Sequence, residues 1–268
     1  MGLTWTEPIV HAVSAQDGMP DARLGHIAVS WRGKLVLFGG GDDMGLGFND
    51  TWILDVSVAV NGDTRPLEAT WRDLKVLGDV RPPCLSDHTG SLVGDSLYVF
   101  GGLAPPNNVY DNIWKLDLSA PEPRWEELHV TGTPPAPRVC HAAVVLGDQI
   151  VVVGGRGSHI AGASGEYATG HGLATMGELG FFAGGLVVLD TTRGRWLPIQ
   201  HPWRWLPQHS TSSDHVQIDN GDDDDVQERV WEHRSGHVMV PAERGLLVIG
   251  GQGYNGEFLN DVLRVEIL

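Results

Sequence analysis

The chain has 268 residues, 41% of them hydrophobic, so it can bury a substantial core and has no bulk signature of disorder. Eighteen basic residues against 34 acidic ones give a formal charge of −16, which repels nucleic-acid phosphates and anionic lipid. We therefore expect neither nucleic acid nor a membrane among its partners. Two cysteines, Cys84 and Cys140, are too few for a disulfide framework and predict a reducing compartment, cytoplasmic or nuclear.

Four histidines recur at one fixed distance from a pair of glycines. Each histidine precedes its Gly-Gly pair by 13 residues. The four pairings are His26 with Gly39-Gly40, His88 with Gly101-Gly102, His141 with Gly154-Gly155, and His237 with Gly250-Gly251. Four identical spacings define an internal repeat, and a repeat of this length predicts a repeat architecture.

Each repeat predicts three short strands in chain order, and three of the four repeats predict a fourth. Two apolar runs separated by a polar turn form a hairpin between histidine and glycines, at 27–31 and 35–38, 91–93 and 97–100, 142–146 and 150–153, and 238–240 and 246–249. A third strand follows the glycines and ends in an acidic residue, at 52–55, 114–117, 187–190 and 263–266. A tryptophan marks a fourth, outer strand at 71–74, 125–128 and 196–197.

The last repeat has no such outer strand after it, whereas residues 3–6, with Trp5, stand before the first repeat. Radially arranged sheets leave edges unless the ring closes. We therefore predict an all-β protein, a β-propeller of four four-stranded blades closed by the N-terminal strand, with residues 4–7 pairing along 262–267. Residues 1–268 form a single domain, with loop insertions at about 156–182 and 200–232.

The repeat resembles the kelch repeat. The resemblance rests on Arg-x-x-His at Arg23, Arg138 and Arg234, on the diglycines, and on Asn49-Asp50-Thr51-Trp52, and it is closest to the kelch part of plant F-box/kelch proteins. Kelch propellers usually have five to seven blades, so four blades indicate either a small propeller or a piece of a longer one. Two repeats depart from the pattern, because Leu85 replaces the arginine in the second and Gly184-Gly185 replaces the Asn-Asp pair in the third.

The segments that lead into the first strand of each blade share a face with the connections between second and third strands. We call this the lead-in face, and both insertions belong to it. The resemblance implies that ligands contact residues there around the central opening. The predicted partner-binding residues are Arg23, Leu24, Gly25, Ser86, Asp87, Arg138, Val139, Cys140, Trp203, Trp205, Arg234, Ser235 and Gly236. For the three arginines the alternative is an architectural role, hydrogen-bonding loop carbonyls between blades.

An acidic run lies between Asp219 and Asp225, in the same insertion as Trp203 and Trp205. Three interpretations stay open: a solvated tract, a surface that binds a basic peptide with these two tryptophans as aromatic anchors, and a calcium loop. The spacing of the carboxylates matches no known calcium loop.

Two functional classes remain. The first is a non-catalytic platform or adaptor that binds a protein or peptide on the lead-in face, and the negative charge of the chain favours a basic partner. The alternative is a kelch-propeller enzyme or metal-dependent specifier protein, of the lyase or oxidase type, using the central opening. The repeat architecture explains the four histidines, and no activated nucleophile or Glu-x3-Asp-x3-His pattern is present. We therefore favour the first class and expect no cofactor and no metal.

Overall fold

The computed structural model describes residues 7–13, 18–57, 68–158, 179–181, 186–197, 204–207, 234–243, 245–253 and 256–266. Within these ranges all the named elements are β-strands. A helix long and apolar enough to cross a membrane is not found in this part of the chain.

The first blade is an antiparallel meander with one added strand. Its strands run in spatial order as β2 (Ile27–Trp31), β3 (Lys34–Phe38), β4 (Thr51–Ser57) and β5 (Glu68–Asp73), with β1 (Ile9–Ala12) parallel to β5 on the outer edge. The turn between β2 and β3 has positive φ at Arg32 (48°) and Gly33 (75°), which matches the right-handed twist of a tight hairpin.

The same meander recurs three times. The second blade comprises β6 (Thr89–Val93), β7 (Ser96–Phe100), β10 (Ile113–Asp117) and β11 (Trp125–Glu127). The third comprises β13 (Ala142–Leu146), β14 (Gln149–Val153), β17 (Val187–Asp190) and β18 (Arg195–Leu197). The fourth comprises β21 (Val238–Ala242), β22 (Gly245–Gly253), β23 (Phe258–Glu266) and β19 (Arg204–Pro207). The prediction of four four-stranded blades is confirmed.

Short strands lie in the segments that lead into the blades and in the connections between second and third strands. They are β8 (Leu103–Ala104), β9 (Asn108–Val109), β12 (Arg138–Val139), β15 (Arg156–Ser158), β16 (Leu179–Phe181) and β20 (Arg234–Ser235). Two of these, β15 and β16, pair with each other, so the ends of the predicted insertion at 156–182 continue the sheet structure.

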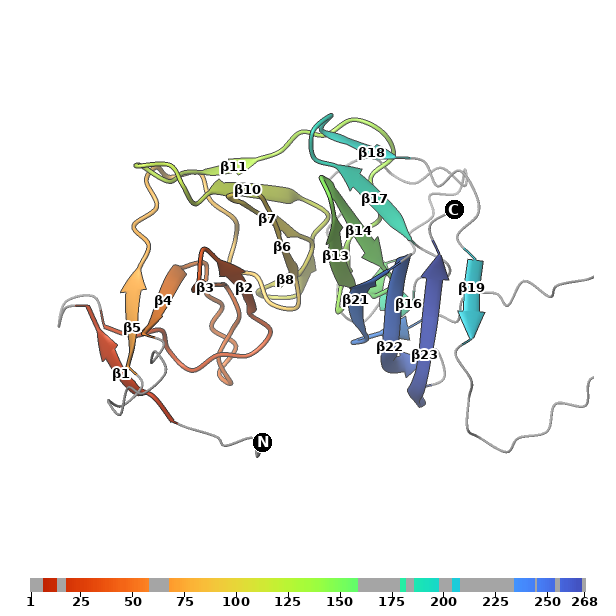
Figure 1. The fold of residues 1–268 in the computed structure, drawn as a ribbon, viewed down its shortest axis with the longest axis horizontal. Coiled ribbons are helices and arrows are strands. Elements are labelled where there is room, and N and C mark those ends of the chain that lie inside the picture. Colours follow the sequence, from red (N-terminus) through yellow and green to blue (C-terminus); the bar gives the residue numbers. More distant parts are fainter. Residues whose placement is uncertain are drawn as a thin grey trace, which may run out of the picture.

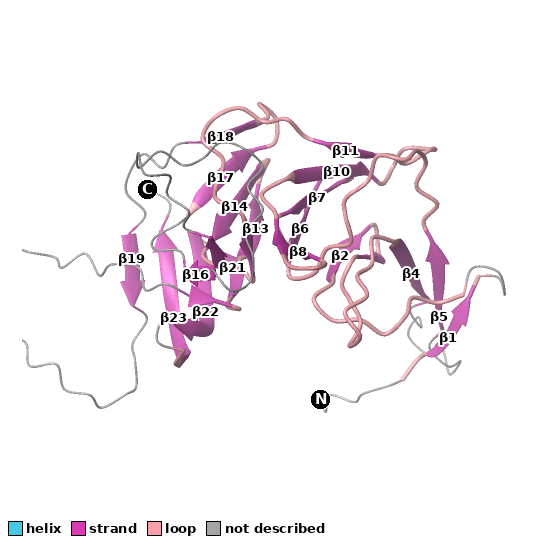
Figure 2. Cartoon of the chain, turned by 180° about the vertical axis from the view of Figure 1, so that it is seen from behind, coloured by secondary structure: helices cyan, strands magenta, loops and turns pink. Residues whose placement is uncertain are grey.

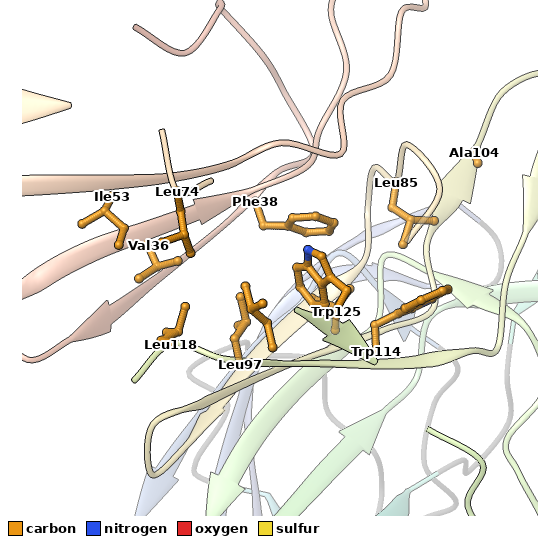
Figure 3. Close-up of a cluster of buried hydrophobic side chains, with 12 residues drawn as sticks. Val36, Phe38, Ile53, Leu74, Leu85, Leu97, Ala104, Trp114, Leu118 and Trp125 are labelled. Atoms are coloured by element: carbon orange, nitrogen blue, oxygen red, sulfur yellow. The ribbon is translucent and has the colours of Figure 1, made fainter. Parts of the chain in front are cut away.

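The blades follow one another along an arc, with the first and fourth at its opposite ends (Figures 1 and 2). Each blade packs on the next through a separate apolar cluster. Between blades one and two, Phe38 lies against Trp125 with ring centroids 4.8 Å apart, and Leu97 and Val36 complete the contact (Figure 3). Burying a side chain such as Phe38 stabilises the fold by roughly 1.5–3 kcal/mol.

The prediction for the edge of the last blade is wrong. Strand β19 occupies that edge, with Trp205 opposite Val265, so β23 has partners on both sides and cannot also pair with residues 4–7. The first described strand, β1, pairs with β5 instead, and residues 1–6 lie outside the described residues. The described strands therefore show no closure of the ring by the N-terminus.

A sequence signal for β19 exists. Arg195-Trp196-Leu197-Pro198 and Arg204-Trp205-Leu206-Pro207 are identical tetrapeptides, and each supplies the outer strand of a blade. The second copy stands in the connection just before blade four, so it reaches the edge of that blade without crossing the arc.

Candidate functional site: the lead-in face

One backbone position is built alike in all four blades. The residue before each repeat histidine is left-handed, with φ of 66° at Gly25, 55° at Asp87, 53° at Cys140 and 64° at Gly236. The amide of each later residue donates to the carbonyl of the one before it: Asp87 to Gly25 (2.8 Å), Cys140 to Asp87 (3.0 Å) and Gly236 to Cys140 (2.8 Å). The structure thus brings these four predicted residues together in one chain of hydrogen bonds from blade to blade.

The residue before each of these four left-handed residues links the chain of hydrogen bonds to the loops between second and third strands. Leu24 pairs with Gly41, and Ser86 pairs with Leu103. In the other two blades Val139 pairs with Arg156 and Ser235 with Gln252. The two sets of loops therefore share a face, as the sequence predicted.

The predicted site residues differ in what they offer to a partner. Leu24 and Gly236 are exposed, and Gly25, Ser86, Asp87 and Cys140 are half-buried. Val139 and Ser235 are buried. Trp203 lies outside the described residues, and for Trp205 only the backbone, paired in β19, is described.

The three arginines are buried within the blades rather than displayed. Arg23 donates to both carboxylate oxygens of Asp50 (2.6 and 3.0 Å) and to the carbonyl of Gly39 (3.1 Å). Arg234 repeats this arrangement with Asp261 (2.7 and 2.9 Å) and Gly250 (3.1 Å).

Arg138 likewise donates to the carbonyl of Gly154 at 3.0 Å. This geometry supports the architectural alternative, because each guanidinium holds the first glycine of its own repeat and is covered. It corrects the prediction that Arg23, Arg138 and Arg234 form a contact surface.

Burial affects the charge states of this network little at neutral pH. It lowers the pKa of the Arg138 guanidinium to about 10, so that group stays charged. Burial by itself would raise the pKa of Asp50, but hydrogen bonds from Arg23 and Trp52 outweigh it and hold the pKa below its ordinary value. The ion pair is therefore formed throughout the neutral range.

An apolar patch on the first blade was not predicted. Met44 is 86% exposed, and Leu24 and Leu46 are each 61% exposed. The Asp42 carboxylate accepts the amides of Met44 (3.0 Å) and Leu46 (2.7 Å), which fixes the loop that presents them. Glycines around an apolar pair, from Gly41 to Gly47, within a predicted second-to-third connection were the available signal.

The patch is continuous with the second blade. A methyl group placed on Gly25 would lie 3.0 Å from Cβ of Ser86 and 3.2 Å from the Asp87 carboxylate. One placed on Gly47 would lie 2.7 Å from Cβ of Cys84. Gly25, the neighbour of Leu24, thus lies against an acidic side chain of the second blade, Asp87.

Cys140 is unsuited to nucleophilic chemistry. Burial, with help from the Asp87 carboxylate and against the nearby Arg156, raises the pKa of its thiol to about 11. At neutral pH it is a thiol rather than the reactive thiolate. In the described ranges no group of three or more His, Cys, Asp or Glu side chains is arranged to hold a metal ion.

The buried histidines predict a loss of stability in acid. Burial is the main reason that the pKa of His88 falls to about 3 and that of His237 to about 4. The unfolded chain binds protons on these rings below about pH 6.5 and the folded chain does not, so the free energy of unfolding falls as the pH drops from about 6.5 toward 4. Between about pH 6.5 and 5 each histidine costs about 2 kcal/mol, measurable by urea unfolding.

The variant His88→Gln serves as the control, because it removes one of the titrating rings. Its unfolding free energy should change less between these two pH values than that of the unaltered chain. Carboxylates titrate below this window, so a pH-independent unfolding free energy in the unaltered protein would contradict the prediction.

Radial four-stranded blades with repeated inter-blade contacts define a β-propeller repeat protein. Residues 3–212 match the family model of the KLHDC2/KLHL20/DRC7 Kelch-repeats domain, and the chain belongs to the kelch-repeat family. Kelch-repeat domains act in general in protein–protein interaction.

Curated relatives include an F-box/kelch-repeat protein of Arabidopsis thaliana, 32% identical over 59% of this chain and 33% of that protein. Acyl-CoA-binding domain-containing protein 4 of the same plant is 35% identical over 55% of this chain and 20% of its own length. This chain spans a third or less of the length of these relatives. Among solved structures, YjhT aligns over 91% of this chain and 84% of its own at 15% identity, with a TM-score of 0.48.

Proposed function

We propose that this kelch domain is a non-catalytic platform that binds a protein or peptide on its lead-in face. The observation that carries the proposal is a uniform backbone with varied side chains at one position, Gly25, Asp87, Cys140 and Gly236. A residue with a side chain costs roughly 1–2 kcal/mol more than glycine in the left-handed conformation. Asp87 and Cys140 thus hold side chains on this face where glycine would be more stable, as functional surfaces often do.

The chemistry of the face favours a partner with an apolar anchor and basic flanks. Leu24, Met44 and Leu46 offer an exposed apolar surface, and apolar and aromatic anchors dominate interface energetics. Asp87 lies against Gly25, the neighbour of Leu24, and the net charge of −16 steers basic molecules inward. Binding should weaken as salt is added.

The acidic run at 219–225 belongs to this proposal, although it lies outside the described residues. It stands between β19 and β20, the short strand that leads into blade four, so it would extend the lead-in face. Trp203, also outside the described residues, is left out of the proposed surface, because the next residue, Arg204, pairs with Glu266 at the end of β23 that lies away from the lead-in face. Capture of a basic partner should weaken after deletion of 214–228, and unchanged capture would remove this segment from the binding surface.

A matched pair of charge reversals tests the face directly. Asp87→Lys alters the lead-in face, whereas Glu122→Lys makes the same change in the connection from β10 to β11, on the opposite face. Glu122 is 68% exposed and 3.5 Å from Arg124, so its loss costs little stability. Cell extract is passed over the immobilised domain, and the bound proteins are quantified by mass spectrometry. Proteins bound by the unaltered chain should be lost from Asp87→Lys and kept by Glu122→Lys.

A purified partner from that experiment should bind Asp87→Lys at least about tenfold more weakly. The opposite pattern, with capture lost only from Glu122→Lys, would place the binding surface on the other face.

Binding in a reducing compartment is part of the proposal, because Cys84 and Cys140 are free thiols. The enzyme or metal-dependent specifier alternative stays a prediction, and stoichiometric iron or copper in the purified protein would favour it over the platform.

A further inference from the structure

The fourth blade carries an uncovered apolar face. We call it the forward face; it consists of Val238, Val240, Leu247 and Ile249. Val238 is 57% exposed, Val240 36% and Ile249 41%. Counting from the repeat histidine, the corresponding residues in blade one are Ile27, Val29, Val36 and Phe38, which pack against blade two. The forward face is therefore one half of a contact whose other half lies outside blade four.

The three contacts within the chain share one construction. The first glycine of each diglycine lies under the following blade, where a methyl group would meet a backbone carbonyl and a histidine ring. For Gly39 the distances are 2.7 Å to the Leu85 carbonyl and 2.8 Å to His88; for Gly101, 2.7 Å to Arg138 and 2.9 Å to His141; for Gly154, 2.6 Å to Arg234 and 2.8 Å to His237. A methyl group on Gly250 would meet only Leu259 of its own blade, at 3.1 Å, among the residues described.

The first blade presents the complementary half. His26 is exposed, whereas its counterparts His88, His141 and His237 are 5–6% exposed beneath the preceding blade. Two of these rings lie on the aromatic residue that corresponds to Ile249: His88 on Phe38 at 5.4 Å and His141 on Phe100 at 5.2 Å.

The chain of backbone hydrogen bonds is also open at both ends. It starts at Gly25, whose amide has no hydrogen-bond acceptor among the described residues, and stops at Gly236, whose carbonyl has no donor among them. The two ends are complementary, because the Gly25 amide is a donor and the Gly236 carbonyl is an acceptor, as in the three bonds within the chain.

We propose that the forward face of blade four binds the first blade of a second copy of this chain. His26 of one copy then lies over Ile249 and Gly250 of the other, and the Gly25 amide donates to the Gly236 carbonyl across the contact. Each copy has one forward face on blade four and one uncovered first blade. Two copies therefore form two identical contacts related by a twofold axis and close a ring of eight blades. The second copy is favoured because this contact continues one that the chain already makes three times.

The test measures the mass of the full-length chain by sedimentation velocity over a wide concentration range. The unaltered chain is expected to form a dimer. Ile249→Glu and His26→Glu should each raise its dissociation constant at least about tenfold, because every contact in either homodimer is damaged. Leu77→Glu is the control. Leu77 is 39% exposed and belongs to neither of the two surfaces proposed to pair, so this variant should leave the dimer intact.

Mixing the two variants is the sharper measurement. Ile249→Glu retains an intact first blade and His26→Glu an intact fourth blade, so the mixture should form a one-to-one complex through a single sound contact. Circular dichroism checks that each variant is folded. An unaltered chain that is monomeric at every concentration overturns the proposal, and so does a His26→Glu variant that still dimerises alone, since the forward face would then pair with itself.

Discussion

Replacing Arg234 with alanine is expected to lower the free energy of unfolding by about 3 kcal/mol. The guanidinium is buried, donates to both carboxylate oxygens of Asp261 and also holds the carbonyl of Gly250. Alanine leaves the carboxylate and the carbonyl without these donors. Asp261 is 33% exposed, so water recovers part of the loss, which keeps the cost toward the lower end for a broken buried pair.

Arg32→Ala is the matched control. Arg32 also donates two hydrogen bonds to a carboxylate, that of Asp95, at 2.9 and 2.7 Å, but its side chain is 61% exposed. Exposed pairs contribute about 1 kcal/mol or less, so this variant should remain close to the unaltered chain in urea unfolding. Arg234→Lys keeps the charge without the planar fork and should fall between them. Equal losses for Arg234→Ala and Arg32→Ala would contradict an architectural role for the buried arginine.

The sequence predicted the blades because their signal is local. Apolar runs around a tight turn define each hairpin, and the distance from His88 to Gly101 repeats in every blade. The arginines were harder, because the pattern Arg-x-x-His does not tell whether the guanidinium faces a partner or the interior. The deciding partner is an aspartate 27 residues further along the chain: Arg23 donates to Asp50 and Arg234 donates to Asp261. In the second repeat, Leu85 and Asn112 replace both members of this pair.

The edge of the fourth blade could not be read from the repeat alone. A strand can pair with any free edge of suitable length, and both the N-terminus and the second Arg-Trp-Leu-Pro segment met that condition. Similarly, the exposure of His26 follows from the position of its blade at the end of the arc, not from its sequence context, which matches that of the buried repeat histidines.

Gly154→Ala is expected to lower the free energy of unfolding by about 3 kcal/mol or more. Two costs add. Gly154 has φ of 64°, where alanine is strained by roughly 1–2 kcal/mol, and the new methyl group would lie 2.6 Å from the Arg234 carbonyl and 2.8 Å from the His237 ring. A backbone carbonyl in an inter-blade contact cannot move aside without separating the blades, which adds about 1–3 kcal/mol of overpacking. Thermal or urea unfolding of the variant measures the sum.

Two other glycines separate these costs. Gly147 has φ of 60° and no atom within 4 Å of an added methyl group, so Gly147→Ala should show the backbone strain alone. Gly250 has the same φ of 60° and meets only Leu259 at 3.1 Å, so in dilute solution Gly250→Ala should resemble Gly147→Ala more than Gly154→Ala. If Gly250→Ala in dilute solution cost as much as Gly154→Ala, a blade of the same chain would have to lie on Gly250, and the arc would be closed without a second copy.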